Sequence, residues 1–229
     1  IELPKNNSKI LKKLVLCDFV VVCGFPYILN HKIIQTSRNG IINCHAGKLP
    51  EYRGGSPLNW QLINNEKNFG ISVIKINNTI DGGDIIEERK FNLKRKYTIN
   101  NLHQIANNHF PKMVFLSLIK LLNNFKTIKQ NNRKAKVYRQ RNSKDSYLNF
   151  KNMNYNKIDC FVRALQSPYP FSFFLYKNFK YEIIKIKKIN LRLSPGKILK
   201  KNNRIFFGCK NASIEIIKYR LSKEKLVFS

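Results

Sequence analysis

Apolar residues in the first half of the chain come in short runs separated by turn residues. The run from Asp18 to Cys23 is almost continuously apolar and is bounded by Gly24 and Pro26, which is typical of a central parallel strand. A turn and the start of a helix are expected over 24–29. The other elements predicted here are short helices over 31–36 and 58–64 and strands over 41–44, 70–76 and 85–90.

Residues 101–125 have the clearest helical pattern. Their apolar positions recur at spacings of three and four, and we expect this helix to cover one face of the sheet. Residues 126–136 that follow are rich in Lys, Asn and Gln and almost without apolar side chains. The pattern therefore predicts a first domain over 1–125 and a linker over 126–145.

The last third of the chain changes character. A helix around Ile158 to Leu165 precedes Ser167-Pro168-Tyr169-Pro170, and β-like runs follow. These runs occupy 171–176, 181–189, 197–199, 204–209 and 213–219. Short strands at this spacing predict a second domain over 146–229, built as a small barrel or an open antiparallel sheet.

Composition bounds the class of protein. The 229 residues carry 43 Lys and Arg against 13 Asp and Glu, a formal net charge of +30. Because Lys is scattered with Asn and Ile through nearly every segment, the charge indicates compositional bias more than a dedicated RNA-binding face. It does predict salt-sensitive, nonspecific attraction to polyanions.

The cysteines and the longest apolar run bear on compartment. Five cysteines, an odd number without CxxC spacing, argue against a disulfide framework or a zinc cage and favour a reducing cytoplasm. The apolar stretch over 14–25 contains Asp18 and is shorter than the about 20 residues that a membrane-spanning helix needs. We therefore expect a cytoplasmic protein with no membrane segment.

The candidate chemistry lies at the end of the strand that contains Ile41 and Ile42. Side chains at i and i+2 of a strand share a face, so Asn43 and His45 point one way and Cys44 points the other. Asp81-Gly82-Gly83-Asp84 adds carboxylates and a tight turn. An amide, an imidazole and a carboxylate are thus predicted to converge, with no metal required.

These positions, together with Leu49-Pro50, Tyr52-Arg53-Gly54, Pro57 and Gly70, resemble the formyltransferases that use 10-formyltetrahydrofolate. The resemblance runs from about Phe19 to the C-terminus. It implies a Rossmann-like α/β domain followed by a small OB-like β domain, the latter also signalled by Arg163-Ala164 and Pro195-Gly196.

The resemblance also implies roles for individual residues. Asn43, His45 and Asp81 fall on the family's catalytic triad, in which donors stabilise an oxyanion and a proton moves to the departing tetrahydrofolate nitrogen. Folate contacts are expected from Tyr27, Ile28, Leu29, Ile80 and Asp84, although Asp84 taken alone favours a loop-shaping role. Acceptor contacts are expected from Arg53, Asn59 and Trp60.

Within the family, Pro57 to Trp60 and Arg141 to Phe150 look like the enzymes that act on nucleotide-linked 4-amino sugars for cell-surface polysaccharide. Methionyl-tRNA is the alternative acceptor. For the oligomeric state, a homodimer is one of the alternatives. Family members carry an opening Rossmann half before the strand that here begins near Val15, so an N-terminally truncated domain is expected, with weakened stability or activity.

Two hypotheses from other classes remain. One is a thiol hydrolase that uses Cys44 and His45, which their opposite orientation on a strand argues against. The other is an inactive fragment or a nonenzymatic RNA-binding module, supported only by the basic OB-like domain.

Overall fold

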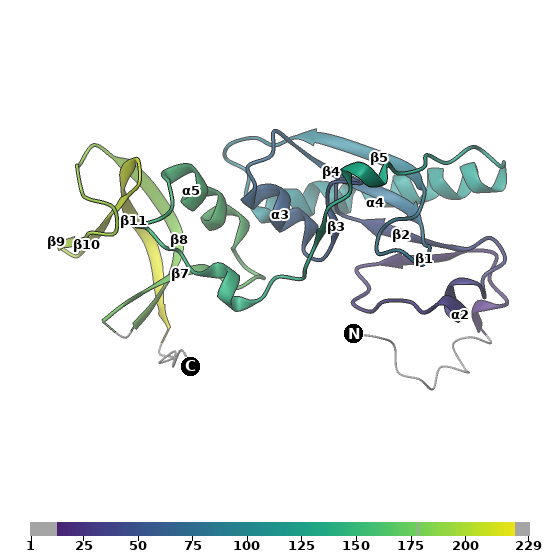
Figure 1. Cartoon of the computed structure of the whole chain (residues 1–229), viewed down its shortest axis with the longest axis horizontal. Coiled ribbons are helices and arrows are strands. Elements are labelled where there is room, and N and C mark those ends of the chain that lie inside the picture. The colour runs from purple at the N-terminus through teal and green to yellow at the C-terminus, as the bar shows by residue number, and fades with distance from the viewer. Residues whose placement is uncertain (1–12, 178, 223–229) are drawn as a thin grey trace. The chain divides into compact units, whose positions relative to one another are not determined.

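The computed structural model describes residues 13–177 and 179–222, which divide into two compact units (Figure 1). The first unit contains the described residues up to Gln61 together with Lys67–Leu93 and Leu102–Gln140. The second contains Leu62–Glu66, Lys94–Asn101 and the described chain from Arg141 onward. An α/β unit is thus followed by a β-rich one, as the sequence predicts.

The elements up to residue 140 match most of the predicted ones. In chain order they are β1 (Val20–Cys23), α2 (His31–Ile34), β2 (Ile41–His45), β3 (Arg53–Gly54), α3 (Pro57–Ile63), β4 (Asn68–Lys75), β5 (Ile85–Asn92), α4 (Ile99–Leu122), the 3-10 helix η1 (Asn132–Lys134) and β6 (Val137–Tyr138). The expected helix start over 24–29 is wrong. Helix α2 begins only after Asn30, whose side chain accepts a hydrogen bond from the Ile33 backbone N–H and so caps the helix.

The sheet of the first unit has the strand order β1-β2-β4-β5. Strands β1 and β2 are parallel, with Val20 opposite Ile41 and Cys23 opposite Cys44, whereas β4 is antiparallel to both β2 and β5. The expectation of a central position for β1 is corrected: in the described part of the chain β1 pairs with β2 alone and lies at the edge of the sheet. Because β1 and β2 are parallel, their carboxyl ends meet at one edge, where α/β folds place ligands.

The middle of this sheet is covered on both faces. All six inner residues of β4 are buried, which explains its nearly unbroken apolar sequence. Helix α4 packs against β5, where the His109 ring meets the Phe91 ring with centroids 4.7 Å apart and Lys120 Nζ lies 2.6 Å from Glu87 Oε1. This confirms that the long helix covers a sheet face.

The segment that follows α4 lies along the first unit. Ile85 and Ile128 exchange backbone hydrogen bonds of 2.8 and 2.9 Å, and β6 pairs in parallel with β3. The polar residues 126–140, which the sequence assigns to a linker, therefore contribute contacts to the unit that carries the candidate chemistry.

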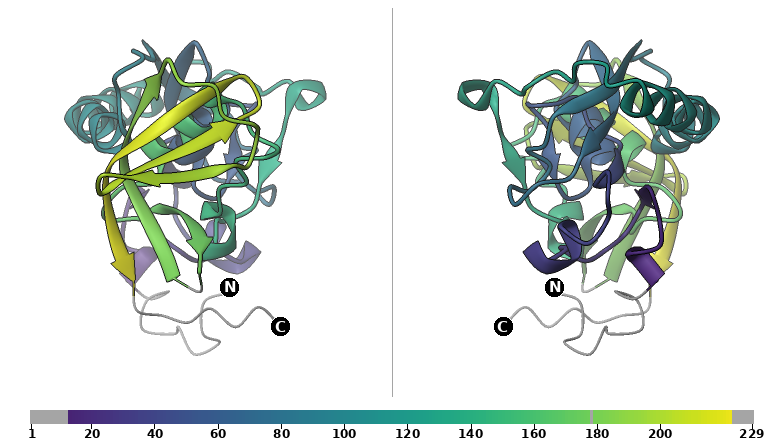
Figure 2. Two further views of the ribbon diagram at one scale, coloured as in Figure 1. Left: turned by 90° about the vertical axis from the view of Figure 1, so that its left-hand side faces the viewer. Right: turned by 90° about the vertical axis from the view of Figure 1, so that its right-hand side faces the viewer.

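The second unit is a helix packed on one antiparallel sheet. Its elements are the 3-10 helix η2 (Ser143–Ser146), α5 (Tyr155–Ala164), β7 (Ser172–Tyr176), β8 (Phe179–Ile189), β9 (Ile198–Lys201), β10 (Arg204–Cys209) and β11 (Ala212–Ser222). The strand order is β7-β8-β11-β10-β9, and Figure 2 shows these twisted strands in green to yellow in its left view. Ile158 and Val162 of α5 join Phe174, Ile183 and Phe207 of the sheet in one core.

Candidate active site

Strand β2 presents Asn43 and His45 on one face, as the alternation predicts. Asn43 lies opposite Ile74 and His45 opposite Ser72 on the neighbouring strand β4. Asp81 comes from the turn that joins β4 to β5 and has a φ of 45°, in the left-handed region that Asp tolerates better than most residues. The turn brings its carboxylate back over the end of β2.

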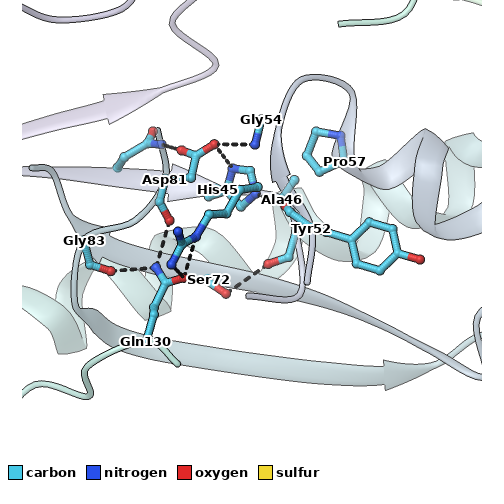
Figure 3. Close-up of polar contacts among 12 residues, drawn as sticks. His45, Ala46, Tyr52, Gly54, Pro57, Ser72, Asp81, Gly83 and Gln130 are labelled. Atoms are coloured by element: carbon cyan, nitrogen blue, oxygen red, sulfur yellow. Dashed lines mark hydrogen bonds and ion pairs between the residues drawn. The ribbon is translucent and has the colours of Figure 1, made fainter. Parts of the chain in front are cut away.

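The Asp81 carboxylate is the centre of the site (Figure 3). Oδ1 accepts a hydrogen bond of 3.3 Å from Asn43 Nδ2, and Oδ2 accepts one of 2.8 Å from the Gly54 backbone N–H. Oδ2 also lies 3.4 Å from His45 Nδ1. The structure thus brings together the three residues predicted from sequence, and it adds a backbone donor from β3.

His45 is held at both ring nitrogens. Nε2 donates to the Tyr52 backbone carbonyl over 2.6 Å, which leaves Nδ1 to face Asp81. The contact between Nδ1 and the Asp81 carboxylate is a charge-assisted hydrogen bond only when Nδ1 carries a proton as well as Nε2. His45 is 5% exposed, and a Cβ at Gly47 would lie 2.4 Å from both Nε2 and the Tyr52 oxygen. Gly47 is therefore required by the close approach of the imidazole.

Arg53, predicted to contact the acceptor, is buried inside this network. Its Nε and Nη2 donate to Gln130 Oε1 over 3.0 and 2.8 Å, and Nη2 also donates to Asn132 Oδ1 over 2.8 Å. Burial lowers the pKa of the guanidinium, and the nearby Asp81 carboxylate opposes that shift. In this arrangement the Arg53 side chain bonds to other residues of the site, Gln130 and Asn132.

The other two predicted acceptor residues also pack within the fold. Asn59 is 1% exposed on α3. The Trp60 indole Nε1 donates to the Arg139 carbonyl over 3.1 Å, and its ring lies 5.5 Å from the Tyr138 ring, centroid to centroid. An acceptor role for Asn59 and Trp60 stays a prediction.

The predicted folate residues fall into two groups. Tyr27, Ile28 and Leu29 lie in the loop that follows β1, with 38% of Tyr27 and 54% of Ile28 exposed. Ile80 is 47% exposed beside Asp81. Asp84 instead shapes the turn, since its Oδ2 accepts from Thr127 Oγ1 over 2.9 Å and its backbone carbonyl accepts from the Lys75 N–H over 2.9 Å.

The thiol, metal and membrane hypotheses can also be compared with the described residues. Burial and the adjacent Cys23 thiol raise the pKa of Cys44, which disfavours the thiolate that a thiol hydrolase needs. No cluster of three or more His, Cys, Asp or Glu is arranged as a metal site within 13–177 and 179–222. None of the helices in these ranges is long and apolar enough to cross a membrane.

Several functional contacts come from positions that sequence reasoning does not single out. They are the Tyr52 carbonyl, the Gly54 N–H, Gln130 and Thr127. Tyr52 and Gly54 lie in a segment that carries the family resemblance, but their contacts use backbone atoms. Gln130 and Thr127 stand in a polar stretch with no periodicity, so no local signal marks them.

Comparisons with known proteins find relatives in sequence and in fold. The methionyl-tRNA formyltransferase of Orientia tsutsugamushi is 28% identical over 91% of this chain and 68% of its own length. Among solved structures, HypX from Aquifex aeolicus with tetrahydrofolic acid superposes with a TM-score of 0.67 at 15% identity, over 93% of this chain and 37% of that one. An N-formyltransferase from Helicobacter canadensis, in complex with folinic acid and dTDP-3-aminofucose, superposes with a TM-score of 0.63 at 21% identity, over 80% of this chain and 68% of that one.

The chain thus spans about two fifths of the HypX chain and about two thirds of the other two proteins. Two family models match its sequence: "Formyl transferase" over residues 3–116 and "Formyl transferase, C-terminal domain" over residues 141–227. Together they take in the strands of the candidate site and the β-rich second unit, so this chain belongs to the formyltransferase family, whose members are enzymes that transfer formyl groups.

Proposed function

We propose that this chain transfers a formyl group from 10-formyltetrahydrofolate to a primary amine. The observation that carries the proposal is the Asp81 carboxylate, which accepts hydrogen bonds from Asn43 Nδ2 and Gly54 N and faces His45 Nδ1. An amide donor and an imidazole that both lie beside one carboxylate are groups suited to acyl transfer to an amine.

The reaction assigns a task to each group. The amine nitrogen bonds to the formyl carbon, the bond from that carbon to N10 of the folate breaks, and one amine proton ends on N10. Asn43 Nδ2 carries two hydrogens and Asp81 accepts one, so the other can be donated to the oxyanion. Asp81 and His45 form the proton-handling pair, with Asp81 orienting the imidazole through Nδ1.

The folate assignment rests on place and on relatives. The loop with Tyr27, Ile28 and Leu29 follows β1 at the same sheet edge as Asn43 and His45, because β1 and β2 are parallel. Two structurally similar proteins carry tetrahydrofolic acid or folinic acid in their crystals. We infer that 10-formyltetrahydrofolate packs its pterin on this exposed loop and directs the formyl group on N10 toward Asn43.

For the acceptor, we propose methionyl-tRNA ahead of a nucleotide-linked amino sugar. The likeness to the sugar-acting enzymes depends partly on Asn59 and Trp60, but Asn59 is 1% exposed and the Trp60 ring packs on Tyr138. The Orientia relative is named a methionyl-tRNA formyltransferase, and it covers 91% of this chain. The similar Helicobacter canadensis enzyme with dTDP-3-aminofucose keeps the amino sugar as second candidate.

A side-by-side assay tests both parts of the proposal. The protein is given 10-formyltetrahydrofolate with either methionyl-tRNA or a dTDP-linked amino sugar at physiological salt, and formylated product is measured. We expect faster formylation of methionyl-tRNA, falling steeply with added salt. Faster formylation of the sugar would reverse the choice of acceptor, and no product with either acceptor would contradict formyl transfer by this chain.

A further inference from the structure

The turn that presents Asp81 is held in place by residues distant in sequence. Asp81 has a φ of 45°, and such a conformation persists in a non-glycine residue when surrounding contacts enforce it. Gly83 packs so closely on β4 that an added Cβ would lie 1.5 Å from the Lys75 carbonyl oxygen. On the other side of the turn, Thr127 and Ile128 bond to Asp84 and Ile85.

Gln130 also bonds to the Asp81 turn, and Figure 3 shows its carboxamide against the turn. Its Nε2 donates to the Asp81 carbonyl over 2.8 Å and to the Gly83 carbonyl over 2.7 Å. Both amide hydrogens are therefore spent on the backbone of the turn that carries the Asp81 carboxylate. The side chain thus holds the backbone from which that carboxylate projects.

The oxygen of the same carboxamide serves the second segment of the site. Oε1 accepts from Nε and Nη2 of Arg53, which is 3% exposed. Arg53 directly precedes Gly54, whose N–H donates to Asp81 Oδ2. One side chain thus joins the turn that supplies the carboxylate to the strand that supplies its backbone donor.

The amide orientation follows from its neighbours. The nitrogen faces two carbonyl oxygens, which only accept, and the oxygen faces a guanidinium, which only donates. A flipped amide would place like groups together on both sides. A glutamate at this position would keep the Arg53 contact and lose both donors.

We propose that Gln130 is a positioning residue of the formyl-transfer site, which sets the Asp81 carboxylate against Asn43 and His45 by tying the Asp81 turn to Arg53. The proposal rests on the function proposed above and deepens it. It assigns a catalytic consequence to a residue that acts through its bonds to the Asp81 turn and to Arg53. It also makes the segment after α4 part of the active site.

The test compares Gln130→Met, which has a similar length and no hydrogen bonds, with Gln130→Glu, which keeps only the acceptor. Gln104→Met, at an exposed position of α4 in the same unit, is the matched control. We expect both Gln130 variants to lower kcat by about 10- to 100-fold with KM values within about threefold of wild type, because a displacement near 1 Å can cost that much. Gln104→Met should match wild type.

A second readout needs no catalysis. The Gly54 amide donates to Asp81 Oδ2, so its resonance in a ¹H–¹⁵N NMR spectrum reports where the carboxylate lies. It should move in both Gln130 variants and stay in place in Gln104→Met. If wild type transfers no formyl group, the proposed function fails, whereas the Gly54 resonance still decides whether Gln130 holds Asp81.

The proposal is wrong if Gln130→Met merely lowers the urea midpoint while turnover per folded molecule and the Gly54 resonance remain as in wild type. Full kcat in Gln130→Glu would also overturn it, because the bonds to the Asp81 and Gly83 carbonyls would then be dispensable.

Discussion

The Asp81 turn and the loop after β1 both carry predicted site residues and are built in opposite ways. The turn is tied on every side: Gln130 bonds two of its carbonyls, Thr127 bonds Asp84, and Gly83 abuts the Lys75 carbonyl. The loop exposes Phe25, Tyr27 and Ile28, and nothing lies within 4 Å of a Cβ added to Gly24. A rigid turn suits a group that must hold a geometry, and an open loop suits a surface that a ligand covers.

The largest expected effect on this contrast comes from adding one methyl group to each segment. Gly83→Ala should cost about 3 kcal/mol or more in unfolding free energy, because the backbone must move away from the Lys75 carbonyl. Gly24→Ala should cost about 1 kcal/mol, since only its φ of 61° is unfavourable for alanine. Trp60, the single tryptophan, lies in the first unit, so its fluorescence in a urea titration reports both. Equal losses would contradict the contrast.

A smaller effect should separate binding from chemistry. Tyr27→Ala truncates a residue that is 38% exposed, so it should cost much less stability than Gly83→Ala. If a pterin packs on this ring, KM for 10-formyltetrahydrofolate should rise about 3- to 10-fold with kcat nearly unchanged, as expected for a ring contact worth about 0.5–1.5 kcal/mol. An unchanged KM would remove Tyr27 from the folate site.

The smallest effect is expected at Cys44, on the opposite face of β2. Burial and Cys23 raise the pKa of this thiol, so its thiolate is scarce at neutral pH and grows only in strongly alkaline solution. Iodoacetamide at pH 7 should label the exposed Cys17 before Cys44, and Cys44→Ala should keep formyl transfer. Loss of transfer in Cys44→Ala, with folding intact, would revive the thiol hypothesis.

The strand-borne part of the site is predictable from sequence because it depends on local geometry. Alternation along β2 places Asn43 and His45 on one face, and Asp81-Gly82-Gly83 marks a turn that can return to them. The long helix α4 and the five strands of the second unit are likewise predicted, with ends within a few residues of those in the structure.

The residues that hold the site in place through tertiary contacts are not predictable in the same way. Gln130 lies 49 positions from Asp81 in a polar stretch that resembles a linker, and nothing local distinguishes it from Gln140 or Gln104. Arg53 and Trp60 have residue types that suit ligand binding, yet tertiary contacts engage them elsewhere. The position of β1 depends on which strands pair with it, which hydrophobicity does not encode.

The central claim is that Asn43, His45 and Asp81 form a formyl-transfer site, and turnover of Asn43→Ala tests it most directly. Asn43 is half-buried at the end of β2 and Asp81 keeps its Gly54 contact without it, so the fold should survive. We predict that kcat for formyl transfer falls about 10²–10³-fold, as for the loss of one oxyanion donor, while tetrahydrofolate binding measured by calorimetry is retained. Wild-type turnover in a folded Asn43→Ala protein would contradict the account.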